Sequence, residues 1–344
     1  MDIIKLGILG LGRIGKIHLE TICTKIEGVK VIAAMNPSIE GRSFADRYGI
    51  PLVTDNAMAV LHHPEIDAVL ICSPTNTHSD YVIEAAHAGK AIFCEKPIDL
   101  SLNKVRETLQ IVSNANVPLM IAFNQRFDPN FATIKEGITA GKLGRLYTVH
   151  ITSRDPSPPP VSYIKQSGGL FIDMTIHDFD MARYIVDAEV VEVYAKGYNL
   201  IDPEIGIAGD IDTGIILLTF DNEVTVIIEN SRKASYGYDQ RLEVFGSLGM
   251  MKAENPIKND CTFFDKKGAH LPRHLDFFMD RYTMSYQKEI EAFIHALKNK
   301  QPMPINGEDG LKAMIIAQAA NISVKENRPV KIDEILIIPG SLPH

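Results

Sequence analysis

The stretch "GILGLGRIGKIH", residues 7–18, is the feature that most constrains the fold. Its glycines have the spacing G-x-G-x-x-G between an apolar, strand-like run and a segment of helical periodicity. In that setting glycines permit a tight turn, the close approach of a pyrophosphate, and tight packing of the helix, whose N-terminus favours an anion. A glycine-rich turn without a ligand is the alternative. The pattern predicts a dinucleotide-binding βαβ unit whose cofactor-binding residues are Gly10, Gly12, Arg13, Ile14 and Gly15.

The organisation of the chain changes near residue 123. Before it, short apolar runs such as "KVIAAM" and "AVLICS" alternate with helical stretches, which is typical of a parallel sheet covered by helices on both faces. Because 344 residues exceed the usual size of one domain, we expect two. The predicted domains are residues 1–123, an α/β Rossmann domain for NAD(P), and residues 124–344, a domain for substrate binding and oligomerisation.

The second half is predicted to be an α+β domain with an open, largely antiparallel sheet. A helix near residues 130–140 and the strand "RLYTVHITS" precede a proline-rich loop. The run "GGLFIDMTIHDFDMARY", residues 168–184, has helical spacing, and strand-like segments follow it. "TFDNEVTV" contains the Asp-Asn pair expected of a hairpin turn, and "MSYQKEIEAFIHALKN" is predicted to be a helix.

Charge and composition exclude several classes of partner. The formal net charge is −8 and lysine and arginine form no long cluster, so neither nucleic acid nor an anionic membrane surface is expected to bind. No apolar run reaches membrane-spanning length, and the N-terminus lacks the pattern of a signal peptide. The four cysteines are scattered without a CxxC pair, which predicts buried free thiols and a reducing, cytoplasmic location.

Asn36 stands where an acid usually binds the adenosine ribose, about twenty residues after the glycine turn. An asparagine can hydrogen-bond a hydroxyl, but it lacks the carboxylate that would repel a 2′-phosphate. NAD is the expected cofactor, and NADP is possible because Asn36 replaces the usual acid. Arg42 is a candidate phosphate contact, although a solvated helix residue is the favoured interpretation.

Polar residues follow two later strands of the predicted sheet. Ligands of a doubly wound sheet bind outside the carboxyl ends of its strands. Lys96 could stabilise the oxygen of a substrate hydroxyl as negative charge develops, while a surface lysine before a turn is the alternative. His78 is more often a residue at a helix start than a catalyst. The predicted cofactor-binding residues at these strand ends are Ser73, Thr75, Asn76, His78, Glu95 and Lys96.

An acid and an imidazole interrupt the apolar run of residues 168–184. Asp173 and His177 are four residues apart, so on one continuous helix they would lie on the same face and could touch. Their neighbours Ile172, Ile176 and Phe179 form an apolar stripe, which predicts that much of the helix is buried. A buried carboxylate needs a partner, so the two could simply satisfy each other in a core.

Taken together, the glycine turn, "EKP" and "GGLFIDMTIHDFDMAR" resemble the Gfo/Idh/MocA family, that of glucose–fructose oxidoreductase and inositol dehydrogenase. Within it the chain is most similar to the inositol 2-dehydrogenases, over nearly its whole length, through "TSRDPSPPPVSYIKQSGG", "IHDFDMAR" and "YGYDQRLEVFGSLGM". The resemblance implies NAD(P)-dependent oxidation of a ring secondary alcohol of a cyclitol, such as myo-inositol to 2-keto-myo-inositol. It also implies a homotetramer.

The resemblance also assigns roles to individual residues. It implies a catalytic set of Lys96, Asp173 and His177, and a polyol pocket lined by Tyr236 and Tyr238. Arg126 and Arg154 would border that pocket. With a pKa near neutrality, an imidazole suits proton removal, so His177 is the expected base; Lys96 is the alternative acceptor. Asp173 would orient the imidazole and stabilise its charged form.

Two alternatives stay open at this point. A related enzyme acting on scyllo-inositol, another cyclitol or a sugar would have the same motifs, because pockets of the same residue types can bind epimers. A non-catalytic dinucleotide-binding sensor is the more distant alternative. No metal is expected, since Pro272 interrupts the spacing of His270 and His274 and the adjacent His62 and His63 point different ways in regular structure.

Overall fold

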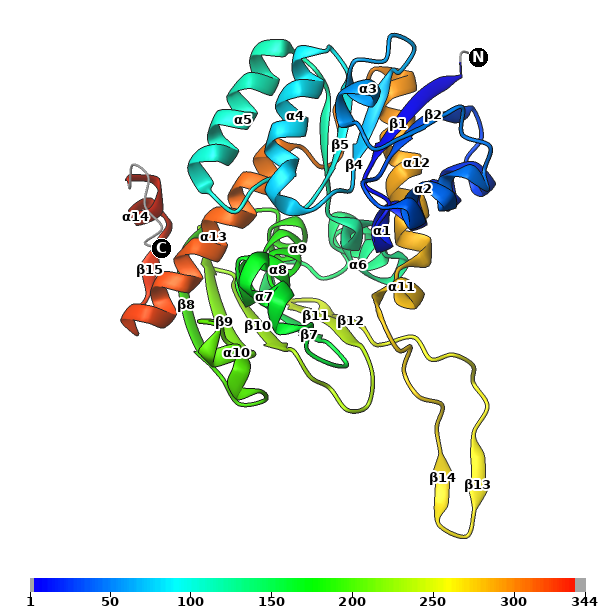
Figure 1. Ribbon diagram of the computed structural model, residues 1–344. Coiled ribbons are helices and arrows are strands. Elements are labelled where there is room, and N and C mark those ends of the chain that lie inside the picture. The colour runs from blue at the N-terminus through cyan, green and yellow to red at the C-terminus, as the bar shows by residue number, and fades with distance from the viewer. Residues whose placement is uncertain (1–2, 338–344) are drawn as a thin grey trace. The chain divides into compact units, whose positions relative to one another are not determined.

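The computed structural model describes residues 3–337 and divides into two compact units (Figure 1). One unit contains the residues up to Phe127 together with Met284–Lys312. The other contains Asp128–Thr283 and the segment that begins at Ala313. Each unit has its own sheet and its own buried core.

A six-stranded parallel sheet in the order β3-β2-β1-β4-β5-β6 forms the centre of the first unit. The strands are β1 (Ile4–Leu9), β2 (Val29–Met35), β3 (Leu52–Thr54), β4 (Ala68–Ile71), β5 (Ala91–Glu95) and β6 (Leu119–Ala122). Strands β4 and β6 are buried along their whole length, as expected of a sheet covered on both faces. This is the strand order of a Rossmann fold, and it confirms the predicted fold class.

Helices connect these strands and cover the sheet. The α-helices of the unit are α1 (Arg13–Lys25), α2 (Ile39–Asp46), α3 (Ala57–Leu61), α4 (His78–His87), α5 (Leu102–Ala115) and α12 (Thr283–Asn299). Short 3₁₀ turns η1 (Thr75–Thr77) and η2 (Asn124–Phe127) follow β4 and β6. Helix α13 (Gly307–Glu326) begins in this unit.

The segment Met284–Lys312 belongs to the first unit. A single domain boundary after residue 123 does not describe this return of the chain. Aromatic packing explains the return. The ring of Tyr286 lies edge-on to His18 at 5.7 Å between centroids, and Phe293 contacts Phe93 at 5.6 Å. These side chains of α12 are buried against the β5 side of the Rossmann sheet, so the helix completes that core.

A seven-stranded sheet in the order β12-β11-β7-β10-β9-β8-β15 forms the second unit. β7 and β10 are parallel and every other neighbouring pair is antiparallel, so the sheet is largely antiparallel, as predicted. The strands are β7 (Leu146–Arg154), β8 (Val190–Tyr198), β9 (Thr213–Phe220), β10 (Thr225–Ser231), β11 (Asp239–Gly246), β12 (Gly249–Ala253) and β15 (Val330–Lys331). The predicted hairpin at "TFDNEVTV" is confirmed by the pairing of β9 with β10.

Helices of the second unit include α6 (Pro129–Thr139), α7 (Val161–Ser167), α8 (Leu170–Asp173), α9 (Ile176–Val186), α10 (Pro203–Ile207), α11 (Phe278–Arg281) and α14 (Ile332–Ile337). An extended arm carries the small hairpin of β13 (Phe263–Asp265) and β14 (Gly268–His270), seen in yellow in Figure 1. The single helix predicted for residues 168–184 is wrong, because Met174 and Thr175 form a turn between α8 and α9. The predicted burial is confirmed for Ile172, Ile176 and Phe179.

Side chains alternate between the two faces of the second sheet. In β9, Ile216 and Leu218 are fully buried, whereas Ile215 is 56% and Leu217 39% exposed. On neighbouring strands Tyr147 and Phe245 are also exposed, with their rings 5.5 Å apart. One face of this sheet therefore packs in the core, and the other presents apolar side chains.

All four cysteines are free thiols, as predicted, but their expected burial is confirmed only for Cys94. Cys23 is exposed on the solvent side of α1, and Cys261 is exposed in the arm before β13. Over residues 3–337, no helix combines the length and the hydropathy needed to cross a bilayer.

Candidate functional site

The glycine turn between β1 and α1 has the geometry of a phosphate cradle. Gly10 has a φ of +93°, and a Cβ there would lie 2.6 Å from the backbone of Ser73. A Cβ on Gly15 would lie 1.9 Å from the Gly10 carbonyl oxygen. At Gly12, the exposed N-cap of α1, no heavy atom lies within 4 Å of the same position. The turn is thus tight where strand and helix meet and open above the helix N-terminus, which fits a pyrophosphate.

Asn36, at the end of β2, is hydrogen-bonded to the glycine turn. Its Oδ1 accepts the backbone N–H of Leu11 at 2.8 Å, and its Nδ2 donates to Ser38 Oγ at 2.8 Å. Arg42 donates from Nη1 to the carbonyl oxygens of Asn36 and Pro37, at 2.9 and 2.7 Å. The asparagine therefore braces the turn, and the arginine is held by backbone carbonyls.

His78 links the two polar strand ends of the first unit. Its ring is 2% exposed, with Nε2 2.7 Å from the Ser73 carbonyl oxygen and Nδ1 2.8 Å from that of Pro97. The neighbouring Ser79 hydroxyl donates to the Ile98 carbonyl at 3.1 Å. The first residues of α4 thus hold the backbone that follows Lys96. His78 contributes from a buried position, by hydrogen bonds to two backbone carbonyls.

The other predicted residues of this edge lie nearer to solvent. Ser73 Oγ is 2.7 Å from Thr77 Oγ1, within the turn that leads to η1. Thr75 and Lys96 are partly exposed, and Asn76 is exposed. The structure therefore gathers the predicted strand-end residues at the carboxyl edge of β4 and β5, as the topology of a parallel sheet requires.

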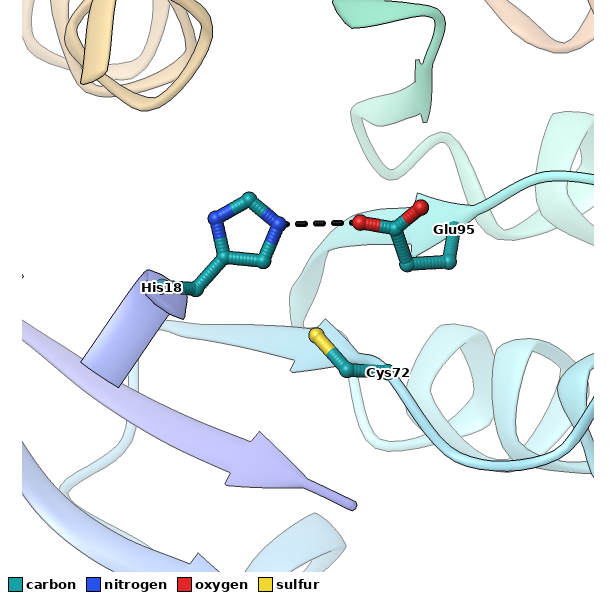
Figure 2. Close-up of side chains that lie close together, drawn as sticks. All are labelled: His18, Cys72 and Glu95. Carbon is teal, nitrogen blue, oxygen red and sulfur yellow. Dashed lines mark hydrogen bonds and ion pairs between the residues drawn. The ribbon is translucent and has the colours of Figure 1, made fainter. Parts of the chain in front are cut away.

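A partly buried cluster of His18, Cys72 and Glu95 lies at this edge. His18 Nε2 is 2.9 Å from Glu95 Oε1, and Cys72 Sγ lies within 4.8 Å of both groups (Figure 2). Burial raises the pKa of the Cys72 thiol well above its usual value. Burial likewise raises the pKa of Glu289, which lies on α12 and has no hydrogen-bond partner among the described residues. His18 thus fixes Glu95, and burial disfavours the charged form of Glu289.

In the second unit, Asp173 ends α8 and is held by two donors. Tyr163 donates from its hydroxyl to Oδ1 at 2.9 Å, and Arg232 donates from Nη1 to Oδ2 at 3.1 Å. His177 lies in the first turn of α9, with its backbone N–H bonded to the Met174 carbonyl at 3.3 Å. The turn between α8 and α9 thus carries the predicted acid and imidazole, and Lys96 belongs to the other unit.

Asp178, beside His177 in sequence, is fully buried. Its Oδ1 is 2.6 Å from Ser153 Oγ, and its Oδ2 accepts Asn230 Nδ2 at 2.7 Å. Burial raises the pKa of Asp178 to about 7, against the opposing effect of these two hydrogen bonds. Ser153 Oγ also lies 3.0 Å from Gln240 Oε1, and its single hydrogen can serve only one acceptor. When Asp178 is protonated, it can donate to Ser153 and leave the Ser153 hydrogen for Gln240.

Arg154 and Tyr236, two predicted substrate residues, contact each other directly. The Arg154 guanidinium donates to the Tyr236 hydroxyl and to Glu229 Oε1, and Tyr236 donates to Asp239 Oδ2 at 2.6 Å. Burial and the bond to Asp239 raise the pKa of Tyr236. The Tyr236 side of this network is open to solvent, since that residue is 42% exposed.

The remaining two predicted substrate residues have different surroundings. Tyr238 is 7% exposed and packs edge-on against Phe277 and Tyr282, each with centroids 6.1 Å away. Arg126, in the first unit, donates to Asp309 Oδ1 at 3.0 Å and is mostly buried. Tyr236 and Arg154 are therefore the pair that the structure brings together, while Tyr238 belongs to an aromatic core.

Residues that the sequence interpretation missed support the predicted ones. Arg232 binds Asp173, Asn230 binds Asp178, and His18 binds Glu95. Asn230 and Arg232 lie in "ENSRK", at the end of a predicted strand. Nothing in that pattern shows that Arg232 contacts Asp173, 59 positions earlier in the chain. Of the histidines considered as metal ligands, His270 is bonded to Asp265 in the arm at 3.0 Å, and His274 packs on Tyr236.

Comparisons with known proteins cover both units. Residues 4–123 match the model of the oxidoreductase family with an NAD-binding Rossmann fold, and residues 131–252 match the Gfo/Idh/MocA C-terminal domain. Myo-inositol 2-dehydrogenase of Thermotoga maritima is 44% identical over 96% of this chain and 99% of that protein. Inositol 2-dehydrogenase of Rhizobium meliloti is 46% identical over 96% of this chain and 99% of that protein.

A solved structure is also similar. Scyllo-inositol dehydrogenase from Lactobacillus casei, with bound NAD(H) and scyllo-inositol, superposes with a TM-score of 0.90 at 33% identity, covering 96% of this chain and 100% of that one. The Rossmann sheet, the glycine cradle and the matched C-terminal domain define an NAD-dependent oxidoreductase. The chain belongs to the Gfo/Idh/MocA family of oxidoreductases.

Proposed function

We propose that this enzyme oxidises a ring secondary alcohol of an inositol with NAD, converting myo-inositol to 2-keto-myo-inositol. Two relatives that are 44% and 46% identical over nearly the full length are named inositol 2-dehydrogenases. The observation that carries the proposal is the Asp173–His177 turn, whose acid is held by Tyr163 and Arg232 in an otherwise apolar segment. A dinucleotide-binding sensor has no need of a proton acceptor fixed in this way.

His177 is the proposed general base. NAD, when bound, takes the hydride from the carbinol carbon, and the protein must take the hydroxyl proton. Asp173 would orient the imidazole and stabilise its charged form. Lys96 would bind the same oxygen and stabilise the negative charge that develops there. In the opposite assignment, Lys96 is the proton acceptor.

Gly12 and the first turn of α1 are the proposed pyrophosphate site, and Asn36 and Arg42 bear on the choice between NAD and NADP. The Arg42 guanidinium is occupied by the carbonyls of Asn36 and Pro37 and lies 3.9 Å from Asp55. A 2′-phosphate would compete with those acceptors and meet the Asp55 carboxylate. The arrangement therefore favours NAD, although Asn36 itself carries no charge.

Arg154 and Tyr236 are the proposed polyol contacts of the second unit. Their network offers a guanidinium, a phenol and the carboxylates of Glu229 and Asp239 in one place. Alternating donors and acceptors suit a ring with a hydroxyl on every carbon. Arg126 and Tyr238 stay predictions for the same pocket.

A scyllo-inositol dehydrogenase is the second candidate function, because a structural relative with that name superposes over almost the whole chain. The two functions differ in the configuration of one carbinol carbon. The test is reduction of NAD and of NADP by the purified protein with myo-inositol, scyllo-inositol, D-chiro-inositol and glucose. Turnover of myo-inositol above the others supports the proposal, and a preference for scyllo-inositol supports the second candidate. NAD binding with no turnover on the whole panel contradicts both and supports the sensor.

We also propose that the chain forms a homotetramer in the cytoplasm. The outer face of the second sheet exposes Tyr147, Ile215, Leu217 and Phe245, an apolar surface that a second copy could cover. The four free thiols support a reducing compartment.

A further inference from the structure

Arg232 is the one arginine of the described chain whose residue is completely inaccessible to solvent, and it follows directly on β10. Its Nη1 donates to Asp173 Oδ2 at 3.1 Å, and its Nη2 donates to Asp210 Oδ2 at 3.3 Å. A guanidinium stays protonated in proteins and presents its donors in a rigid plane. The side chain therefore places a permanent positive charge between two carboxylates.

Asp210 connects the same guanidinium to the start of α8. Its Oδ1 accepts the backbone N–H of Leu170, the first residue of α8, at 2.9 Å. Gly169 precedes it with a φ of +84°, and a Cβ there would lie 2.8 Å from Asp210 Oδ1. Asp173 is the last residue of α8. One guanidinium thus reaches the end of this short helix directly and its beginning through Asp210.

The neighbouring Asn230 holds the turn that follows α8. Residues two apart on a strand face the same side of the sheet. Thr175 donates from its hydroxyl to Asn230 Oδ1 at 2.6 Å, and Asn230 Nδ2 donates to Asp178. Asp173 and Asp178, which flank His177 in sequence, are therefore both anchored to the end of β10.

We propose that Arg232 is a positioning residue for the reaction: it holds Asp173 in a single orientation, so that Asp173 can orient His177. The inference rests on the proposed function. A carboxylate that is only 15% exposed needs a hydrogen-bonding partner, and the Arg232 guanidinium supplies one at 3.1 Å. Arg232 divides its donors between Asp173 and Asp210.

The test compares Arg232→Gln, Arg232→Lys and Arg145→Gln with the wild type. Arg145 is a matched control because it makes an exposed ion pair with Glu223. With inositol and NAD, we expect Arg232→Gln to lower kcat about 100-fold, since a small misplacement of a catalytic group has an effect of that size. The Kd for NAD should not change, and KM for inositol should change less than kcat. Arg232→Lys should recover part of kcat because it keeps the charge but loses the planar fork.

A second measurement is independent of turnover. It is a double-mutant cycle of Arg232→Gln with Asp173→Asn, in which urea unfolding gives the unfolding equilibrium constant of each variant. If the two side chains pair directly, the effect of the double mutant should differ about tenfold from the combined effects of the single mutants. Additive effects would overturn the pairing. A wild-type kcat in folded Arg232→Gln would overturn the positioning role. If the wild type oxidises no inositol, the proposed function fails and with it the catalytic part of the inference, while the cycle still decides the pairing.

Discussion

The side-chain oxygen of Asn36 accepts the backbone N–H of Leu11 across 2.8 Å, so the end of β2 braces the glycine turn. Asn36→Ala removes that acceptor and leaves a buried N–H unpaired, which costs about 1–3 kcal/mol. We expect the Kd for NAD to rise about tenfold, measured by calorimetry. Asn36→Asp keeps the acceptor and adds a charge, so it should bind NAD normally and NADP more weakly. An unchanged Kd in Asn36→Ala would show that the brace does not matter.

Gly12→Ala should separate folding from cofactor binding. A Cβ at Gly12 meets no heavy atom within 4 Å and the backbone φ is −71°, so we expect a Tm close to that of the wild type. The added methyl group would occupy the space proposed for the pyrophosphate, so NAD binding should fall more than tenfold. The contrasting variant is Gly10→Ala, which meets the Ser73 backbone at 2.6 Å and should lower the Tm. Normal NAD binding by Gly12→Ala would contradict the proposed phosphate site.

His177→Ala should lower turnover about 10²–10⁴-fold, the range expected for loss of a general base. NAD binding, measured by fluorescence titration, should stay nearly the same. His150→Ala, an exposed strand residue, serves as the control. Lys96→Met is measured in parallel: if it shifts the pH dependence of kcat while His177→Ala retains turnover, Lys96 is the proton acceptor instead.

Asp178 should make the protein less stable as the pH rises. Burial raises its pKa from 3.8 to about 7, so between these values the folded state binds a proton that the unfolded state does not. The free energy of unfolding should therefore fall by about 1.4 kcal/mol per pH unit from about pH 4 to 7 and level off above. Asp178→Asn, which mimics the neutral acid, should lack this contribution. If the free energy of unfolding, measured with urea, depends on pH in the same way in the wild type and in Asp178→Asn, Asp178 makes no such contribution.

Phe245→Asp should dissociate the proposed tetramer, because it places a charge in the exposed apolar face beside Tyr147. We expect a smaller mass by light scattering than for the wild type. Glu243→Gln, an exposed change two residues earlier on β11, should leave the mass unchanged. A monomeric wild type would contradict the assembly.

What the sequence determined by itself was local. The G-x-G-x-x-G turn, the alternation of apolar runs with helices and the hairpin at β9 and β10 depend on residues close together in the chain, and each has a periodic or spaced pattern. The resemblance of "EKP" and "IHDFDMAR" to a known family added the identity of Lys96, Asp173 and His177 as a set.

Tertiary structure decided the rest. Met174 and Thr175 interrupt the predicted helix, and Arg232 and Asn230, more than fifty residues later, bind Asp173 and Thr175 on either side of the break. The segment Met284–Lys312 joins the Rossmann unit because Tyr286 and Phe293 fill the core beside His18 and Phe93. Buried pairs between distant residues leave no periodic trace in the sequence, since their partners become neighbours only when the sheet forms.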